Sequence, residues 1–307
     1  MKSYGPMKKL LATLPGVIPL VRIFKNFYYG LRHQFHLGTD NIDGVIHLHK
    51  GVEESLAYVA DVFEDYFRFS GIEKQAFEGT HVLEIGPGDS LGVALMMVGL
   101  GVKQVVCVDR FLTYRDPNKE RALTAALVGA APPVAKERMS RCLDSDYRIV
   151  GDVIRYMSDV PFEMAAEKLG EIRFDYIISR AVLEHVYDID KTYACCRRLI
   201  RSGGRMIHKV DLSNHSSIEL YPLQFLTYTE RLWWLMSSNI SRVNRCRCSQ
   251  HRVALEKNRF AIEKFALTKI LGLSQVQSVR PKLRSPFREM TDEDLSILGF
   301  FVVCLAV

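Results

Sequence analysis

The chain has 307 residues, of which 48% are hydrophobic and 25% are charged. This balance is typical of a globular protein that buries a core, and it excludes disordered and low-complexity classes. No apolar run reaches the roughly 18 residues of a membrane-spanning helix. Seven cysteines in a chain of this length do not indicate a disulfide framework, so we expect a reduced, cytoplasmic setting.

The net charge of +6 is concentrated at the N-terminus. Residues 1–39 contain six basic side chains and no acidic one, whereas the rest of the chain holds 35 of each sign. DNA-binding domains normally carry their positive charge on the binding domain itself. We therefore expect no nucleic-acid partner, and the sequence leaves the oligomeric state open.

We interpret residues 1–50 as a basic, amphipathic arm that precedes a domain at 51–307. From Val21 to Phe35, apolar and aromatic residues recur at three- and four-residue spacing with basic residues between them. This pattern is typical of a helix lying on an anionic membrane surface, and it would bring residues 1–35 into contact with a membrane. Two prolines and the lack of a small-residue cleavage site disfavour a secretory signal. The alternatives are a helix packed on the domain or a lid over its pocket.

Helices and strands alternate after the arm. Helices are predicted at 52–69, 91–100, 161–169, 190–200 and 249–258, and strands at 81–85, 105–109, 147–150, 174–179, 205–212, 260–267 and 299–307. This alternation predicts an α/β fold with a doubly wound, largely parallel sheet. An aromatic-rich segment at 213–250 breaks the pattern after the fifth strand, where such folds build substrate pockets. Its aromatic residues could also serve only to pack the segment itself.

The segment 82–92, VLEIGPGDSLG, carries the first chemical signal. It places a strand before a turn in which Gly86 and Gly88 let the backbone approach a ligand closely. A dinucleotide fingerprint would have its third glycine at position 91, where this chain has Leu91, and no P-loop lysine follows. The carboxylate of Glu84 would repel a diphosphate but suits a ligand with an amino group and a positive sulfonium. An NAD-dependent enzyme is therefore the disfavoured alternative.

These residues resemble the first motif of the class I S-adenosylmethionine-dependent methyltransferases, [E/D]-x-G-x-G-x-G, with Ser90 in place of the third glycine. Residues 174–186, FDYIISRAVLEHV, look like the fourth-strand segment of the small-molecule type. The resemblance extends over about residues 72–307. It implies a Rossmann-like sheet of seven strands with an antiparallel final strand, and S-adenosyl-L-methionine as the cofactor.

The resemblance also implies a set of cofactor-binding residues. In it Asp109 accepts hydrogen bonds from the ribose hydroxyls, and Asp152, placed after the third strand, meets the adenine amino group. Without the resemblance, Asp109 could merely cap a turn and Asp152 could be a solvated loop acid. The full set of expected cofactor contacts is Glu84, Gly86, Gly88, Asp109, Asp152 and Ser179.

Methyl transfer from a sulfonium is an in-line displacement, in which the protein mainly aligns the acceptor and excludes water. An alcohol acceptor also needs a base, which we expect past the fourth and fifth strands. The candidates are His185 and His215, with Asp211 orienting the base. His208 and Asp211 point to opposite faces of a strand, so they are not expected to act as one unit.

No metal site is expected. The spacing of His208, Asp211 and His215 matches no zinc motif, and Cys246 and Cys248 are followed by no second pair at zinc-finger spacing.

We therefore expect a methyltransferase that acts on a small molecule, a sugar or a lipid-linked intermediate. The aromatic segment and the basic arm favour a bulky, amphipathic or membrane-borne acceptor, which would make the enzyme peripheral on the membrane. A non-catalytic S-adenosylmethionine-binding or scaffold protein with the same fold is the alternative.

Overall fold

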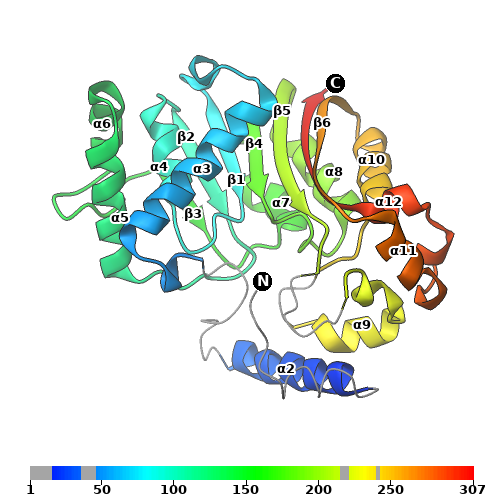
Figure 1. Ribbon diagram of the computed structural model, residues 1–307. Coiled ribbons are helices and arrows are strands. Elements are labelled where there is room, and N and C mark those ends of the chain that lie inside the picture. The colour runs from blue at the N-terminus through cyan, green and yellow to red at the C-terminus, as the bar shows by residue number, and fades with distance from the viewer. Residues whose placement is uncertain (1–15, 36–45, 215–220, 240–242) are drawn as a thin grey trace.

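The computed structural model describes residues 16–35, 46–214, 221–239 and 243–307. Its centre is a seven-stranded sheet of order β3-β2-β1-β4-β5-β7-β6 (Figure 1). The strands are β1 (His81–Ile85), β2 (Gln104–Val108), β3 (Ile154–Met157), β4 (Phe174–Arg180), β5 (Ile200–Asp211), β6 (Phe260–Ile270) and β7 (Ile297–Ala306). Strands β1 to β5 are parallel, and β7 runs antiparallel to β5 and β6. The predicted doubly wound α/β fold with an antiparallel final strand is confirmed.

Helices cover both faces of the sheet, because the central strands are apolar on both sides. One face packs against α3 (Val52–Ser70), α4 (Gly92–Gly99), α5 (Pro117–Ala130) and α6 (Pro133–Ser140). The other packs against α7 (Ala165–Leu169), α8 (Ile189–Leu199) and α10 (Cys248–Lys257). Short 3-10 turns are η1 (His47–His49), η2 (Lys74–Phe77), η3 (Phe162–Met164), η4 (Gln224–Thr227), η5 (Arg280–Lys282) and η6 (Phe287–Glu289).

A third apolar cluster lies beyond the carboxyl ends of β4 and β5. It joins α9 (Glu230–Ser237) to α11 (Leu273–Val279) and α12 (Asp292–Ser296), and it includes Trp233. The indole of Trp233 is buried, and its N–H donates to the Val243 carbonyl at 3.0 Å. Some aromatic residues of 213–250 therefore serve to pack the segment itself, which was one of the two interpretations of the sequence. Trp234 is different, because 54% of it is exposed.

The basic arm contributes α2 (Val17–Gln34), which lies beside α9 (Figure 1). Asn26 fastens the two helices, since its side-chain amide donates to the Leu235 carbonyl and to the Ser238 hydroxyl. Within the described residues, no helix is both long and apolar enough to cross a bilayer.

Local interactions determine where two of the helices end or begin. Gly71 ends α3 with a left-handed φ of +66°, which glycine adopts without steric cost. Thr291 caps α12, because its hydroxyl accepts from the Asp294 backbone N–H at 3.2 Å.

Two strand predictions were wrong. Residues 147–150 form no strand of the sheet, because Tyr147 and Val150 are each 43% exposed and Ile149 makes only an isolated bridge to Leu143. The third strand instead follows Gly151, at Ile154–Met157. The fifth strand, predicted at 205–212, begins earlier, at Ile200, and Gly203 (φ +75°) occupies a bulge in its pairing with β4.

Candidate active site

The turn between β1 and α4 depends on glycine. Gly86 and Gly88 both have left-handed backbones, with φ of +69° and +72°. The Gly86 N–H donates to the Val108 carbonyl at 2.8 Å, which ties the turn to the end of β2. A Cβ on Gly86 would lie 2.5 Å from a methyl of Val182, just after β4. The turn therefore fits closely against the segment that follows β4.

Glu84 lies beneath this turn and is only 6% exposed. Its carboxylate accepts from the Cys107 thiol at 3.5 Å on the neighbouring strand. Burial raises the pKa of Glu84 to about 7, and the charge of Asp109 acts in the same direction against the opposing effects of Cys107 and Arg115. A buried carboxylate with a pKa near neutrality next to a glycine turn is a typical ligand-binding group.

Asp109 directly follows β2 and is 9% exposed. It accepts a hydrogen bond from the Tyr156 hydroxyl at 3.1 Å, and an Arg115 nitrogen lies 3.8 Å from the same oxygen. Burial raises the pKa of Asp109 to about 6, although Arg115, Tyr156 and the Gly88 N–H all oppose the rise. Two acids with raised pKa values therefore flank the glycine turn.

Sequence reasoning missed Arg115 and Tyr156. The Arg115 guanidinium donates to the Gly88 carbonyl at 2.7 Å and lies over the Tyr156 ring, 3.8 Å from its centroid. Both residues thus close around Asp109 from the β2–α5 connection and from β3. No motif marks them, because their role depends on the β2–β3 pairing, and the third strand had been misplaced.

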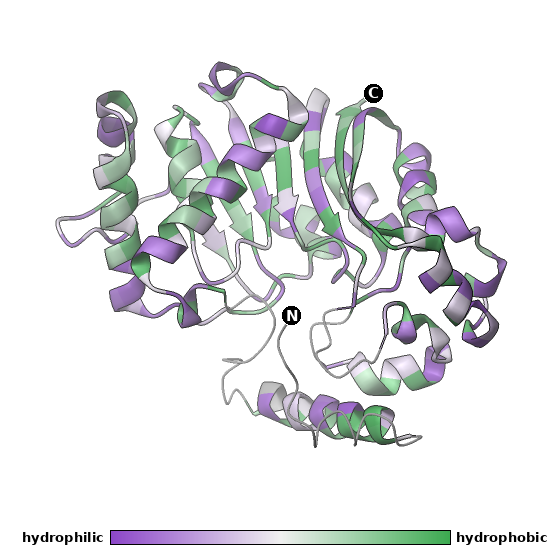
Figure 2. Ribbon diagram, in the orientation of Figure 1, coloured by the Kyte–Doolittle hydropathy of each residue, from purple (hydrophilic) through white to green (hydrophobic). Residues whose placement is uncertain are grey.

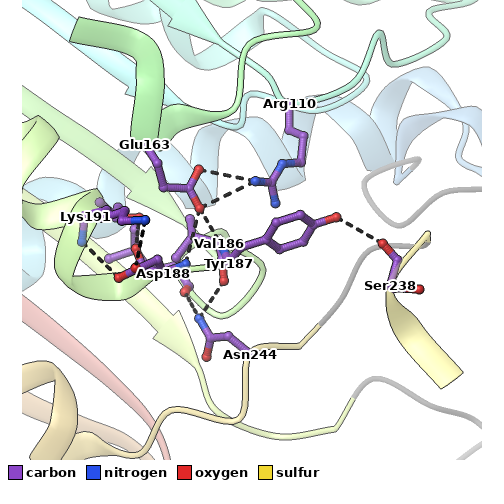
Figure 3. A network of polar contacts seen from close by, with 10 residues as sticks. Arg110, Glu163, Val186, Tyr187, Asp188, Lys191, Ser238 and Asn244 are labelled. Carbon is purple, nitrogen blue, oxygen red and sulfur yellow. Dashed lines mark hydrogen bonds and ion pairs between the residues drawn. The ribbon is translucent and has the colours of Figure 1, made fainter. Parts of the chain in front are cut away.

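The segment after β4 is held from two sides (Figure 3). Glu163 of η3 accepts from the Tyr187 backbone N–H at 2.7 Å and pairs with Arg110 at 3.3 Å, while the Arg110 guanidinium stacks on the Tyr187 ring. From the other side, the Asn244 amide donates to the carbonyls of Leu183 and Val186, and the Tyr187 hydroxyl donates to the Ser238 carbonyl. The aromatic-rich segment therefore adjoins the LEHV motif.

The comparisons agree with this geometry. A family model described as a methyltransferase domain matches residues 58–257, more than half of the chain. The chain belongs to this methyltransferase family. This assignment confirms the methyltransferase that the sequence motifs predicted.

A curated relative, the ubiquinone biosynthesis O-methyltransferase of Methylocella silvestris, is 28% identical over 166 residues. The match covers 52% of this chain, and the chain spans about half the length of that relative.

Two solved structures resemble the methyltransferase at low identity. An S-adenosylmethionine-dependent methyltransferase from Mesorhizobium loti is 14% identical, with 83% of this chain and 100% of that chain covered at a TM-score of 0.44. The geranyl diphosphate C-methyltransferase of Streptomyces coelicolor A3(2) is 12% identical, with 81% and 77% covered at a TM-score of 0.44. At TM-scores this low, neither likeness supports a conclusion about the acceptor.

The placement of Asp152 was wrong. It precedes β3 instead of following it, and its carbonyl accepts from the side chain of Gln104, the first residue of β2. Asp152 therefore lies at the amino ends of the parallel strands, opposite the glycine turn. Ser158 and Asp159 follow β3, and their neighbours Met157 and Val160 hydrogen-bond the backbone of Asp109.

The other predicted site residues that the structure describes lie at or just after the carboxyl ends of β4 and β5. Ser179 lies beside Ile85 in the sheet, but its hydroxyl is buried and bonded to His208 Nδ1 at 2.8 Å. His185 lies in the turn after β4, where its backbone N–H donates to the Val182 carbonyl at 2.8 Å. Asp211 ends β5 and accepts from the Ser213 backbone N–H at 2.9 Å. His215 lies outside the described residues.

Proposed function

We propose that the methyltransferase transfers a methyl group from S-adenosylmethionine to a small or lipid-linked acceptor at the carboxyl ends of β4 and β5. The observation that carries this proposal is the pair of buried acids, Glu84 and Asp109, on either side of a turn built from left-handed glycines. The curated relative is named for O-methylation, which favours oxygen as the methylated atom.

The residues present fit the cofactor. Gly86 fits so closely against Val182 that the turn has no space for a side chain, and Glu84 and Asp109 are buried acceptors on either side of it. Glu84 would hold the amino group and Asp109 the ribose hydroxyls, while Asp159 takes the adenine-side position that Asp152 cannot reach. The cofactor supplies an already activated methyl group.

The protein must still orient the acceptor and remove its proton. We propose His185 or His215 as the base, with Asp211 as the orienting acid. The Glu163, Asn244 and Ser238 contacts hold the backbone around His185 in place, so this histidine is presented by a rigid loop. The segment 213–250 would then form one wall of the acceptor pocket.

S-adenosylhomocysteine should stabilise the protein and NAD should not. At a hundred times its dissociation constant, S-adenosylhomocysteine should add about 2.7 kcal/mol to the free energy of unfolding, or about 4 °C in Tm. Differential scanning fluorimetry measures both ligands. Stabilisation by NAD alone would contradict the proposed cofactor site. Turnover with phenolic acceptors would then separate catalysis from cofactor binding.

We propose further that α2 binds an anionic membrane surface. Its outward stripe is apolar and strongly exposed, with Leu20 at 66%, Phe24 at 81% and Phe27 at 63%. Lys25 is exposed on the same helix and can meet anionic headgroups, whereas Arg22 turns toward the domain and lies over the Trp233 ring. Figure 2 places hydrophobic residues along α2, on the side of the molecule that bears the carboxyl ends of the strands. A membrane-borne acceptor would thus meet the pocket from that side.

The double variant Phe24→Ser, Phe27→Ser should bind vesicles containing anionic phosphatidylglycerol at least tenfold more weakly. Each phenylalanine contributes about 1.5–3 kcal/mol when it is fully buried in an apolar phase, so loss of two has a large effect. Co-sedimentation gives the affinity. Val253→Ser on α10, another exposed apolar residue at 65%, is the matched control. If the wild-type protein does not bind the vesicles and the double variant binds the acceptor more weakly, α2 acts as a lid over the acceptor pocket instead.

A further inference from the structure

A cavity of about 320 Å³ opens at the carboxyl ends of β4 and β5, where they meet β6 and β7. Its wall contains four charged residues, which are Arg180, Lys209, Asp211 and Lys269. The other lining residues are small or apolar apart from Thr268. The function proposed above assigns no role to Arg180, Lys209 or Lys269.

Positive charge is in excess where Arg180 and Lys209 of the cavity wall meet α3. The side chain of Asp65, only 4% exposed, is contacted by three cations at once, namely Arg68, Arg180 and Lys209. One further carboxylate, that of Asp61, approaches the two arginines, at 3.6 Å from Arg68 and 3.8 Å from Arg180. Among the described residues, three cations therefore face two carboxylates.

The cavity wall does not remove this imbalance. Lys269 and Asp211 oppose each other in sign, and the Lys269 ammonium donates to the Ser213 hydroxyl at 3.0 Å. Burial lowers the pKa of Lys209, and repulsion from Arg180 lowers it further. An anion entering the cavity would relieve this repulsion, because it would sit between two half-buried cations where water screens charge weakly.

The cavity also adjoins the proposed transfer site. Ala181 lines it, with a left-handed φ of +54°, and its N–H donates to the Lys209 carbonyl at 2.8 Å. The next residue, Val182, packs against Gly86 of the glycine turn. One residue of backbone, about 3.3 Å, thus separates the wall of the basic cavity from a side chain that touches the cofactor turn.

We propose that this cavity is an acceptor subsite that binds an oxyanion, a carboxylate or a phosphate, through Arg180 and Lys209. The inference rests on the proposed methyl transfer and adds the class of acceptor, which is an anionic molecule. A planar guanidinium beside an ammonium can hold both oxygens of a carboxylate. The subsite would anchor the acceptor by its charged end and leave its reacting atom near the Val182 side of the cavity.

The test uses the full chain saturated with S-adenosylhomocysteine, and titrates benzoate, phenyl phosphate and neutral benzamide by isothermal calorimetry. Benzoate or phenyl phosphate should bind at least tenfold more tightly than benzamide, and the stronger of the two identifies the oxyanion. Arg180→Gln and Lys209→Gln should each weaken that binding at least tenfold. Arg173→Gln, at the opposite end of β4, is the matched control and should leave it unchanged.

Folding and cofactor binding are checked in the same samples. Arg180→Lys keeps the ion pair with Asp65, so it should fold normally and retain more oxyanion binding than Arg180→Gln. Equal binding of benzoate, phenyl phosphate and benzamide by the wild type, or unchanged oxyanion binding in both glutamine variants that still bind S-adenosylhomocysteine, would overturn the subsite. Failure of the wild type to bind S-adenosylhomocysteine would instead overturn the proposed function.

Discussion

Glu84→Gln is expected to make the cofactor-free protein more stable and at the same time less able to bind S-adenosylmethionine. The folded state raises the pKa of Glu84 from 4.5 to about 7, so the fold prefers the protonated acid. Its stability therefore falls as the pH rises from about 4.5 to about 7, because ionisation is harder in the folded than in the unfolded chain. Above that range, the buried charge costs about 3 kcal/mol, which a neutral glutamine does not incur.

Cofactor binding has the opposite requirement, because the ionised carboxylate of Glu84 favours the bound state. A carboxylate paired with the cationic amino group of the cofactor gives a charge-assisted contact worth roughly 1.5–3 kcal/mol, so Glu84→Gln should weaken binding by about 10- to 100-fold. Urea unfolding at pH 8 and pH 5 gives the stability, with a smaller difference between variant and wild type at pH 5, and calorimetry gives the affinity. Glu171→Gln, whose side chain is fully exposed at 102%, is the control and should change neither quantity. A glutamine variant with wild-type affinity would remove Glu84 from the site.

The sequence alone was sufficient wherever a local pattern determined the structure. The glycine turn and the acid at the end of β2 were both recognisable, because each depends on a few neighbouring residues. The doubly wound sheet followed from the alternation of strands and helices, and its antiparallel final strand from the resemblance to a known family.

The prediction of the third strand was wrong for a physical reason. Residues 147–150 and 154–157 are both short, and only pairing with β2 decides which of them joins the sheet. Because of that error, Asp152 was assigned to the carboxyl ends of the strands instead of their amino ends. For the same reason, Tyr156 and Asp159 were not recognised as residues near the site. The cluster around Asp65 was equally invisible, since it joins α3, β4 and β5 across more than a hundred residues of sequence.

Asp109→Asn should weaken S-adenosylmethionine binding by about 10- to 100-fold, whereas Asp152→Asn should not change it. The Asp109 carboxylate can accept from two ribose hydroxyls, and an asparagine replaces one acceptor oxygen with a donor, which loses roughly 1.5–3 kcal/mol. Asp152 carries the same side chain at the amino ends of the strands, beside Gln104, so it is an internal control for position.

The pH dependence gives a second readout for Asp109. The wild-type affinity should fall as the pH decreases through about 7 and then about 6, because Glu84 and Asp109 become protonated in turn and the cationic ligand prefers both acids ionised. Asp109→Asn should remove the lower of these two steps and keep the upper one, while Tyr156 and Arg115 still hold the surrounding loop. Calorimetric titrations between pH 5 and pH 8 resolve the two steps. An asparagine variant that retains both steps would place the ribose away from Asp109, and an effect of Asp152→Asn equal to that of Asp109→Asn would contradict the position assigned to β3.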